Sequence, residues 1–297
     1  MPDTLQPYRR LCTCPSEAIR WACILEATAP KAGNVFPGRP FDDLTYRDFI
    51  AAADITADCF KNDRTRISQR MLNAVAQVQD TQLTNVNLGI VLLLGPLVAA
   101  DEAAVPSNVA TAIHQLQDWH PLVSKSLSVF DNLDGENIFK AIRSATAGGM
   151  GSSESLDVNH THEHVDIHEA MHLAKDRDQI ARQYTNDFRE LIFDITPIVS
   201  NCIASTNDLL LAICQAQIHL LTRAPDTLIA RKNGIKVAID VQNRARRIDP
   251  MDHADMTDFD QYLRSKGHQL NPGTTADMIA AALYLLLRTN PLEKNDE

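Results

Sequence analysis

The amino-acid sequence predicts an all-α protein, organised as a single multi-helix domain over residues 1–297. Three observations support this prediction: two concern the helical class and the single domain, and the third concerns an ordered core. Apolar residues recur at helical spacing along the chain, whereas the alternation that is typical of strands is nearly absent. Glycine accounts for only 11 residues, and no internal repeat or long linker divides the sequence. Because 44% of the residues are apolar, the chain can bury a proper core, which excludes disorder over most of its length.

Capping residues and apolar spacing indicate three helices in the N-terminal part of the chain. We expect Ser16 to cap a helix that ends before Pro30. Thr45, followed three residues later by Asp48, resembles a capping box and opens a second helix. A third helix has one apolar face, carried by Ile67, Met71, Val75 and Val78.

The run from 88 to 100 is predicted to be the central helix of the fold. It has few polar residues on any side, so it must be buried all round. Pro197 is expected to end a long helix that precedes it. Further helices are expected over residues 107–118, 134–146, 168–195, 203–222, 235–247 and 275–288.

The charge balance argues against polyanionic partners that bind over a broad surface. The sequence holds 28 Lys and Arg against 38 Asp and Glu, for a net charge of −10. We therefore expect no nucleic-acid partner and no membrane partner, and any phosphate must be captured locally. The most apolar run is shorter than the roughly 20 residues of a membrane span, and no signal peptide is recognisable. The sequence predicts a cytoplasmic protein.

The six cysteines are expected to be reduced thiols. They are few and scattered, and four of them lie within apolar helical patterns. Cys12 and Cys14 lie one residue apart, but no second cysteine pair is present to complete four zinc ligands.

Polar segments that contain glycine separate the expected helices and predict a shared cleft lined by helix ends. Helix bundles ordinarily use short turns, so several such segments in one chain favour a functional role. The segments are PKAGN at 30–34, TNVNLG at 84–89, AGGMG at 147–151, DTLIARKNG at 226–234 and NPGTTAD at 271–277.

Two of these segments have features of anion-binding sites. In NPGTTAD, Gly273 lets a phosphate approach the start of the last helix, which Thr274 or Thr275 is expected to cap. In AGGMG, Gly148 and Gly149 favour a backbone nest for a phosphate. The structural alternatives are an ordinary capped helix start and a flexible loop.

Two further segments combine acids with cations. Asp226 precedes Lys232 by nearly two helical turns, so the pair could reach opposite ends of one nucleotide, and Arg231 adds a second cation. Lys31 follows a helix that carries Glu26, which adds another cation and another acid to the same cleft. The alternative is that these cations are solvated surface charges or partners of a helix C-terminus.

A cluster of histidines gives a second candidate site. His164, His168 and His172 are spaced four residues apart, so a helix would align them on one face, where they could hold a transition metal. His160 and His162 precede them in a segment that we interpret as a loop, without the HExxH pattern of zincins. The alternative is a polar surface face.

Taken together and in this order, the five segments resemble those of the triphosphoribosyl-dephospho-CoA synthase family, the ATP:dephospho-CoA triphosphoribosyl transferases. The resemblance extends from about Glu26 to Leu287, and members of that family are all-helical. Two positions depart from its usual pattern, because Asn87-Leu88 replaces a His-Lys pair and Thr274-Thr275 replaces Gly-Ser. The resemblance and the chemistry of the segments indicate ATP and phosphate binding at Lys31, Gly33, Asn85, Asn87, Gly89, Gly148, Gly149, Arg231, Lys232 and Gly273.

The resemblance implies transfer of the triphosphoribosyl group of ATP to the 2′-hydroxyl of 3′-dephospho-CoA, with release of adenine. Breaking the N-glycosidic bond builds positive charge on the ribose, which carboxylates stabilise, and one carboxylate can take the proton of the attacking hydroxyl. Asp226 and Asp277 are therefore expected to be catalytic. Mg²⁺ on the triphosphate is expected to bind Glu26, Asp226 and Asp277. A homodimer is the default assembly.

Three alternatives to this function remain open. Because of the departures from the family pattern, the runner-up is a related ribosyl or phosphoribosyl transfer to another acceptor in cofactor biosynthesis, for example that of methanopterin. A non-catalytic nucleotide-binding protein would keep the cleft without the chemistry. A metal-storage or metal-sensing role would use the histidine cluster.

Overall fold

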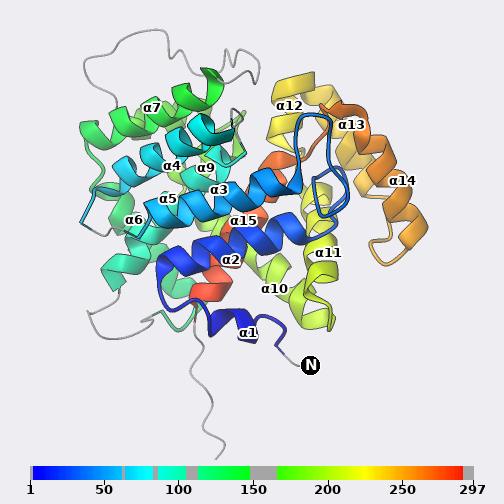
Figure 1. The fold of residues 1–297 in the computed structure, drawn as a ribbon, viewed down its shortest axis with the longest axis horizontal. Helices are drawn as coiled ribbons and strands as arrows, with labels where there is room; N and C mark the ends of the chain where they lie inside the picture. Colours follow the sequence, from blue (N-terminus) through cyan, green and yellow to red (C-terminus); the bar gives the residue numbers. More distant parts are fainter. Residues whose placement is uncertain (1–2, 62–63, 83–85, 105–112, 148–165, 290–297) are drawn as a thin grey trace, which may run out of the picture.

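Two apolar helices, α5 (Leu88–Ala104) and α15 (Gly273–Arg288), lie side by side in the interior of the fold (Figure 1). Almost every residue of α15 from Thr274 onward is buried, and the same holds for α5 from Ile90 to Asp101. The expectation that residues 88–100 form a helix buried all round is confirmed. The equally buried α15 was expected as a helix but not as a second central one.

The all-α class is also confirmed. A computed structural model of the chain describes residues 3–61, 64–82, 86–104, 113–147 and 166–289. Within these residues the chain has one short strand, β1 (Ser265–His268), one 3₁₀ turn (Leu116–Asp118) and one π-turn (Leu191–Ile195). The helices around α5 and α15 are α1 (Gln6–Arg9), α2 (Pro15–Thr28), α3 (Tyr46–Cys59), α4 (Ile67–Gln82), α6 (Trp119–Ser128), α7 (Asn132–Ala147), α8 (Ile167–Ala174), α9 (Gln179–Thr185), α10 (Thr196–Ser205), α11 (Leu209–Arg223), α12 (Thr227–Asn233), α13 (Ile235–Ala245) and α14 (His253–Arg264).

The remaining helices cover the central pair from several sides. The helices α2, α3, α4 and α7 pack in that order, each against the next, and α2 also contacts α15. The helices α10 and α11 pack against α15 as well. Beyond α11, the helices α12, α13 and α14 contribute to a smaller apolar cluster of their own (Figure 1). The N-terminus of α15 therefore lies where the large and the small apolar clusters meet.

Two of the three predicted helix caps are wrong. The N-cap of α2 is Cys14, with Pro15 at the first helical position, and Ser16 is buried one residue later. The N-cap of α15 is Pro272 rather than a threonine. The third prediction, the capping box of Thr45 with Asp48, is confirmed at the start of α3.

The predicted helix over 168–195 is broken into α8, α9 and the π-turn. Asp178 caps α9 by accepting hydrogen bonds from two backbone N–H groups, which ends the helical path from α8. Asp187 and Phe188 then adopt left-handed backbone angles, with φ of 53° and 60°. Pro197 does not end a helix but lies in the first turn of α10, where a missing N–H costs nothing.

Other boundaries differ for similar local reasons. Asp208 caps α11, so the predicted helix over 203–222 is divided between α10 and α11. Part of the predicted helix over 107–118 lies outside the described residues, and its described end has only the 3₁₀ turn. The helices α6 and α14 were not expected. All six cysteines are free thiols, as expected.

A buried ion pair joins the two central helices at the end away from the start of α15. Arg288 of α15 donates to both carboxylate oxygens of Asp101 of α5, at 2.6 and 3.0 Å, and each side chain is about 1% exposed. Tyr284 donates to the same carboxylate at 2.8 Å, and Arg288 also donates to the carbonyl of Cys12. These bonds offset the cost of placing two charges in the interior.

Replacing Arg288 with methionine should therefore destabilise the protein strongly. The variant Arg288→Met leaves the Asp101 carboxylate buried without its cation, which costs about 3–5 kcal/mol of unfolding free energy. Urea denaturation of Arg288→Met and of the double variant Asp101→Asn/Arg288→Met measures this cost. The double variant should be the more stable of the two, and an equal or lower stability would show that the isolated charge is not the cause.

Candidate active site

Four of the five glycine-containing segments converge on the first turn of α15. Asn34 donates its side-chain amide to Asn271 at 2.7 Å, which joins PKAGN to NPGTTAD. Asp226 joins DTLIARKNG to the same segment through Thr275. The TNVNLG segment contacts this turn at Gly89, which lies against Asp277. The shared location predicted for these segments is confirmed, whereas residues 148–151 of AGGMG lie outside the described residues.

Asp226 ties the starts of two helices together. Its Oδ1 accepts hydrogen bonds from the N–H groups of Leu228 and Ile229, at 2.9 and 3.1 Å, and so caps α12. Its Oδ2 accepts from the N–H and the hydroxyl of Thr275, both at 2.8 Å, in the first turn of α15. Burial raises the pKa of Asp226, and these four hydrogen bonds lower it. Because they use all four acceptor positions of the carboxylate, Asp226 positions the site rather than offering a free ligand.

Lys31 and Glu26 form a buried pair beside this turn. The Lys31 side chain is 0% exposed, and its ammonium donates to Glu26 Oε1 at 2.9 Å. It also donates to the backbone carbonyl of Glu26 and, at 3.5 Å, to that of Ala29. Three acceptors surround its three protons, and the side chain has no exposed surface. Lys31 is therefore paired with Glu26 in this conformation and does not present a cation to a phosphate.

Asp277 is the acid that this arrangement leaves available. It is partly exposed, and no hydrogen bond to its carboxylate is formed by the described residues. Burial, followed by the negative charges of Glu26 and Asp226, raises its pKa well above the usual value, and Arg231 opposes the shift. A carboxyl with such a pKa can exchange protons closer to neutral pH.

The Asp277 carboxylate can occupy its position only because residue 89 is a glycine, which has no side chain. A Cβ atom on Gly89 would lie 2.0 Å from Asp277 Oδ2, so any larger residue would displace the acid. Asn87, two residues earlier, donates its amide to the Thr56 hydroxyl at 2.9 Å and is 4% exposed. Asn85, Gly148 and Gly149 were also expected to bind phosphate, and they lie outside the described residues.

The remaining predicted phosphate ligands lie around the same turn. Arg231 is half-exposed and pairs with Asp178 at 3.5 Å. Lys232 is partly buried, which lowers the pKa of its ammonium, and it donates to the carbonyl of His268 at 3.4 Å. Gly33 adopts a left-handed φ of 74°. A Cβ atom on Gly273 would lie 2.5 Å from a side-chain carbon of Leu228, so this glycine permits close packing of α12 on α15.

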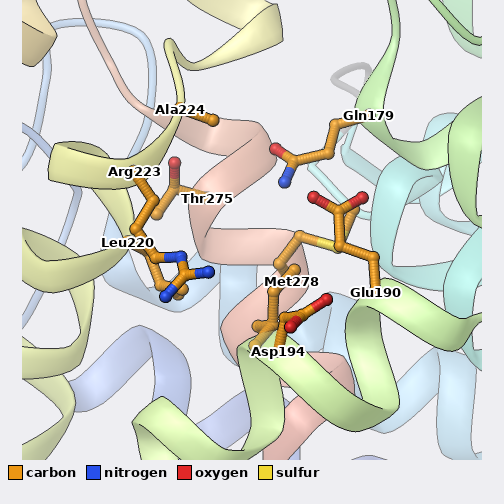
Figure 2. A pocket seen from close by; sticks show the side chains of 9 residues that line it. Gln179, Glu190, Asp194, Leu220, Arg223, Ala224, Thr275 and Met278 are labelled. Carbon is orange, nitrogen blue, oxygen red and sulfur yellow. The ribbon is translucent and has the colours of Figure 1, made fainter.

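The sequence interpretation missed the residues that line a pocket beside Asp226. Gln179, Glu190, Asp194, Arg223 and Thr275 are among the residues that line this hollow (Figure 2). They come from α9, the chain that follows it, the π-turn, α11 and α15. Of these only Thr275 belongs to a glycine-containing segment. Asp178, the N-cap of α9 next to Gln179, was the one local signal available.

The histidine cluster does not form a metal site in the part of the chain that is described. His168 Nε2 lies 3.1 Å from the carbonyl oxygen of Leu127, and His172 faces Lys175. No three His, Cys, Asp or Glu side chains among the described residues are grouped as metal ligands. His160, His162 and His164 lie outside those residues. No helix in the described ranges is long and apolar enough to cross a membrane.

The raised pKa of Asp277 implies a stability cost that depends on pH. Because the pKa of Asp277 is higher in the folded protein than in the unfolded chain, ionisation destabilises the fold as pH rises through that interval. The variant Asp277→Asn should therefore be more stable than the wild type at pH 8. The gain should shrink as pH falls towards 4, where the carboxyl is protonated in the folded protein and partly protonated in the unfolded chain. Urea denaturation at both pH values tests this, with the exposed Asp258→Asn as control, and a loss of stability at pH 8 would contradict it.

Comparison with known proteins places this chain in a family. The CitG family, described as ATP:dephospho-CoA triphosphoribosyl transferase, matches residues 12–296. No curated protein matches the chain. The fold is similar to that of an Archaeoglobus fulgidus protein provisionally described as a triphosphoribosyl-dephospho-CoA synthase, with a TM-score of 0.61, 22% identity, and coverage of 80% of this chain and 98% of the other. Since the family match spans nearly the whole sequence, the chain belongs to the CitG family of ATP:dephospho-CoA triphosphoribosyl transferases.

Proposed function

We propose that the acids around the first turn of α15 are the catalytic centre of this transferase, with Asp277 as the general base. The family reaction joins the triphosphoribosyl group of ATP to 3′-dephospho-CoA. In it, the bond between ribose C1′ and adenine N9 breaks, and its electron pair leaves with adenine. A bond forms between C1′ and the 2′-oxygen of dephospho-CoA, whose proton must be removed. The observation that carries the proposal is a partly exposed acid with a raised pKa among buried acids.

Asp277 suits the role of base for two reasons. Its carboxylate forms no hydrogen bond with the described residues, so it can accept one from the acceptor hydroxyl. Its raised pKa makes it a stronger base than an ordinary aspartate once it is ionised. Gly89 keeps that carboxylate in place by leaving room for Oδ2. Asp277 takes the proton of the hydroxyl and passes it, directly or through water, to the departing adenine, which needs one proton to be released as the neutral base.

The surrounding charges suit a transition state that is positive at the sugar. Glu26, Asp226 and Asp178 all raise the pKa of Asp277, which means that their negative charges act at its position. The same field stabilises positive charge that develops on the ribose as adenine departs. Because these charges are held by Lys31, by backbone N–H groups and by Arg231, they need not reorganise during the reaction.

Mg²⁺ is part of the proposal as the ion that accompanies the triphosphate. Magnesium is usually held by one or two carboxylates together with phosphate oxygens and water, so it needs no cage of three protein ligands. Glu26 Oε2 and Asp277 have free acceptor positions among the described residues, and both offer the oxygen ligands that Mg²⁺ prefers. Glu26 is the proposed ligand when Asp277 serves as base. The ion would neutralise phosphate charge, and Arg231 and Lys232 would bind the rest of the triphosphate.

Replacing Asp277 with asparagine should abolish most of the activity. Loss of a general base lowers turnover by roughly 10²–10⁴-fold, measured as adenine released from ATP, Mg²⁺ and dephospho-CoA. In the wild type, kcat/KM should rise with pH through a pKa above the ordinary aspartate value of 3.8, since the base acts when it is ionised. Mass spectrometry should show an added triphosphoribosyl group on the acceptor.

The exposed variant Asp258→Asn is the matched control and should keep wild-type turnover. If Asp277→Asn retains full turnover and full Mg²⁺ dependence, Asp277 is neither base nor metal ligand. A wild-type protein that binds ATP but releases no adenine with this acceptor would contradict the proposed transfer itself.

A further inference from the structure

The pocket beside Asp226 lies next to the proposed catalytic acids but is distinct from them. Thr275 and Met278 of α15 line it, whereas Asp277 lies against Gly89 of α5. Thr275 and Asp277 are two residues apart on a helix, so their side chains point to different sides of the same turn. A ligand that reaches from one side to the other would therefore pass over the start of α15.

Gln179 is one of the polar residues of this pocket whose side chain has no partner among the described residues. Its backbone is fully used, because its N–H donates to the Thr227 hydroxyl at 3.3 Å and its carbonyl accepts from Gln183 at 3.2 Å. Its side-chain amide forms no hydrogen bond with any described residue, although the residue is only 9% exposed. Figure 2 shows that amide directed into the hollow. An amide that faces the pocket without a protein partner can donate to and accept from a ligand.

Glu190 presents an acceptor on the same wall. Its carboxylate receives two hydrogen bonds from Arg182, both at 2.8 Å, and one from Gln183 at 2.9 Å. These three bonds leave one acceptor position, on Oε1. The pocket therefore offers a donor and an acceptor from the Gln179 amide. It also offers one acceptor position on the Glu190 carboxylate, which Arg182 and Gln183 hold in place.

The other walls are mainly apolar, with a cation at Arg223 and a second acid at Asp194. Met278, Leu220 and Ile195 supply aliphatic and thioether surface. Methionine sulfur packs favourably against aromatic rings. Arg223 is exposed at the end of α11 and forms no ion pair with the described residues. Together these side chains suit a flat, apolar ring that carries an amino group beside a ring nitrogen.

We propose that this pocket binds an adenine ring and that Gln179 recognises it. The 6-amino group of adenine donates and the neighbouring N1 or N7 accepts, which matches the acceptor and donor of one glutamine amide. The remaining acceptor of Glu190 suits the second hydrogen of the amino group. The inference rests on the proposed function, because that function makes ATP and dephospho-CoA the substrates and both contain adenine. It goes further by naming the residue that selects the base.

Binding measurements by calorimetry on the full-length protein test this inference without requiring turnover. Wild type and Gln179→Ala are titrated separately with ATP and with dephospho-CoA, in the presence of Mg²⁺. The substrate whose adenine occupies the pocket should bind Gln179→Ala about tenfold more weakly, in line with the loss of one bidentate contact to the base. The other substrate should be unaffected, so the two arms identify the source of the ring. Unchanged affinity for both substrates would overturn the proposal.

Analogues of the affected substrate separate recognition from a general loss of structure. The 1-deaza and 7-deaza forms each remove one ring acceptor. One of them should bind the wild type about tenfold more weakly than the parent substrate, whereas Gln179→Ala should not distinguish it from the parent. A variant that still discriminates the two would overturn the assignment. The exposed Gln261→Ala should behave as wild type, and equal thermal midpoints for all three proteins exclude unfolding.

The outcome is independent of the catalytic proposal. If the wild type releases adenine and Gln179→Ala binds normally, the pocket assignment fails and the proposed function stands. If binding depends on Gln179 but no adenine is released, the pocket is a nucleotide site and the proposed reaction fails.

Discussion

The geometry of the site depends on the four hydrogen bonds that the carboxylate of Asp226 accepts. This carboxylate caps α12 with one oxygen and holds the first turn of α15 with the other, so it places two helix starts relative to each other. A helix N-terminus favours negative charge, and here one carboxylate serves two of them. This contact places Thr275 in the pocket that we assign to adenine and Asp277 beside Gly89. The two proposed halves of the site are therefore positioned by the same residue.

Charge in the interior is handled in two different ways at the two ends of α15. At its C-terminal end, Arg288 and Tyr284 donate three hydrogen bonds to Asp101, and the cation matches the charge of that acid, which suits a structural role. At its N-terminal end, several acids share few cations, and Asp277 is left without a hydrogen bond from the described residues. Such incomplete compensation costs stability, and it is common where a protein keeps an acid ready for chemistry. The contrast within one helix separates the end that we propose to be catalytic from the end that holds a satisfied ion pair.

The sequence resemblance and the structure assign different roles to two residues of the site. Lys31 was expected to bind phosphate, yet it is fully buried and forms an ion pair with Glu26. Its charge therefore acts on that acid rather than on a ligand. Asp226 was expected to be catalytic, yet its oxygens are occupied by N–H and hydroxyl donors. Both residues belong to the recognised segments, but their geometry indicates that they position other groups. Presence in a motif thus marks the neighbourhood of a site more reliably than the role of each residue.

The sequence by itself determined the fold class, the buried α5, the capping box of α3 and the segments that meet at α15. These features follow from apolar spacing, from contacts within four residues or from a resemblance spread over the chain. Only the tertiary structure decided the breaks between α8 and α10 and the pairing of Asp226 with Thr275, which are 49 residues apart. It also brought Gln179 and Glu190 into one pocket. No local pattern encodes such contacts, because they arise when distant helix ends pack together and exclude water.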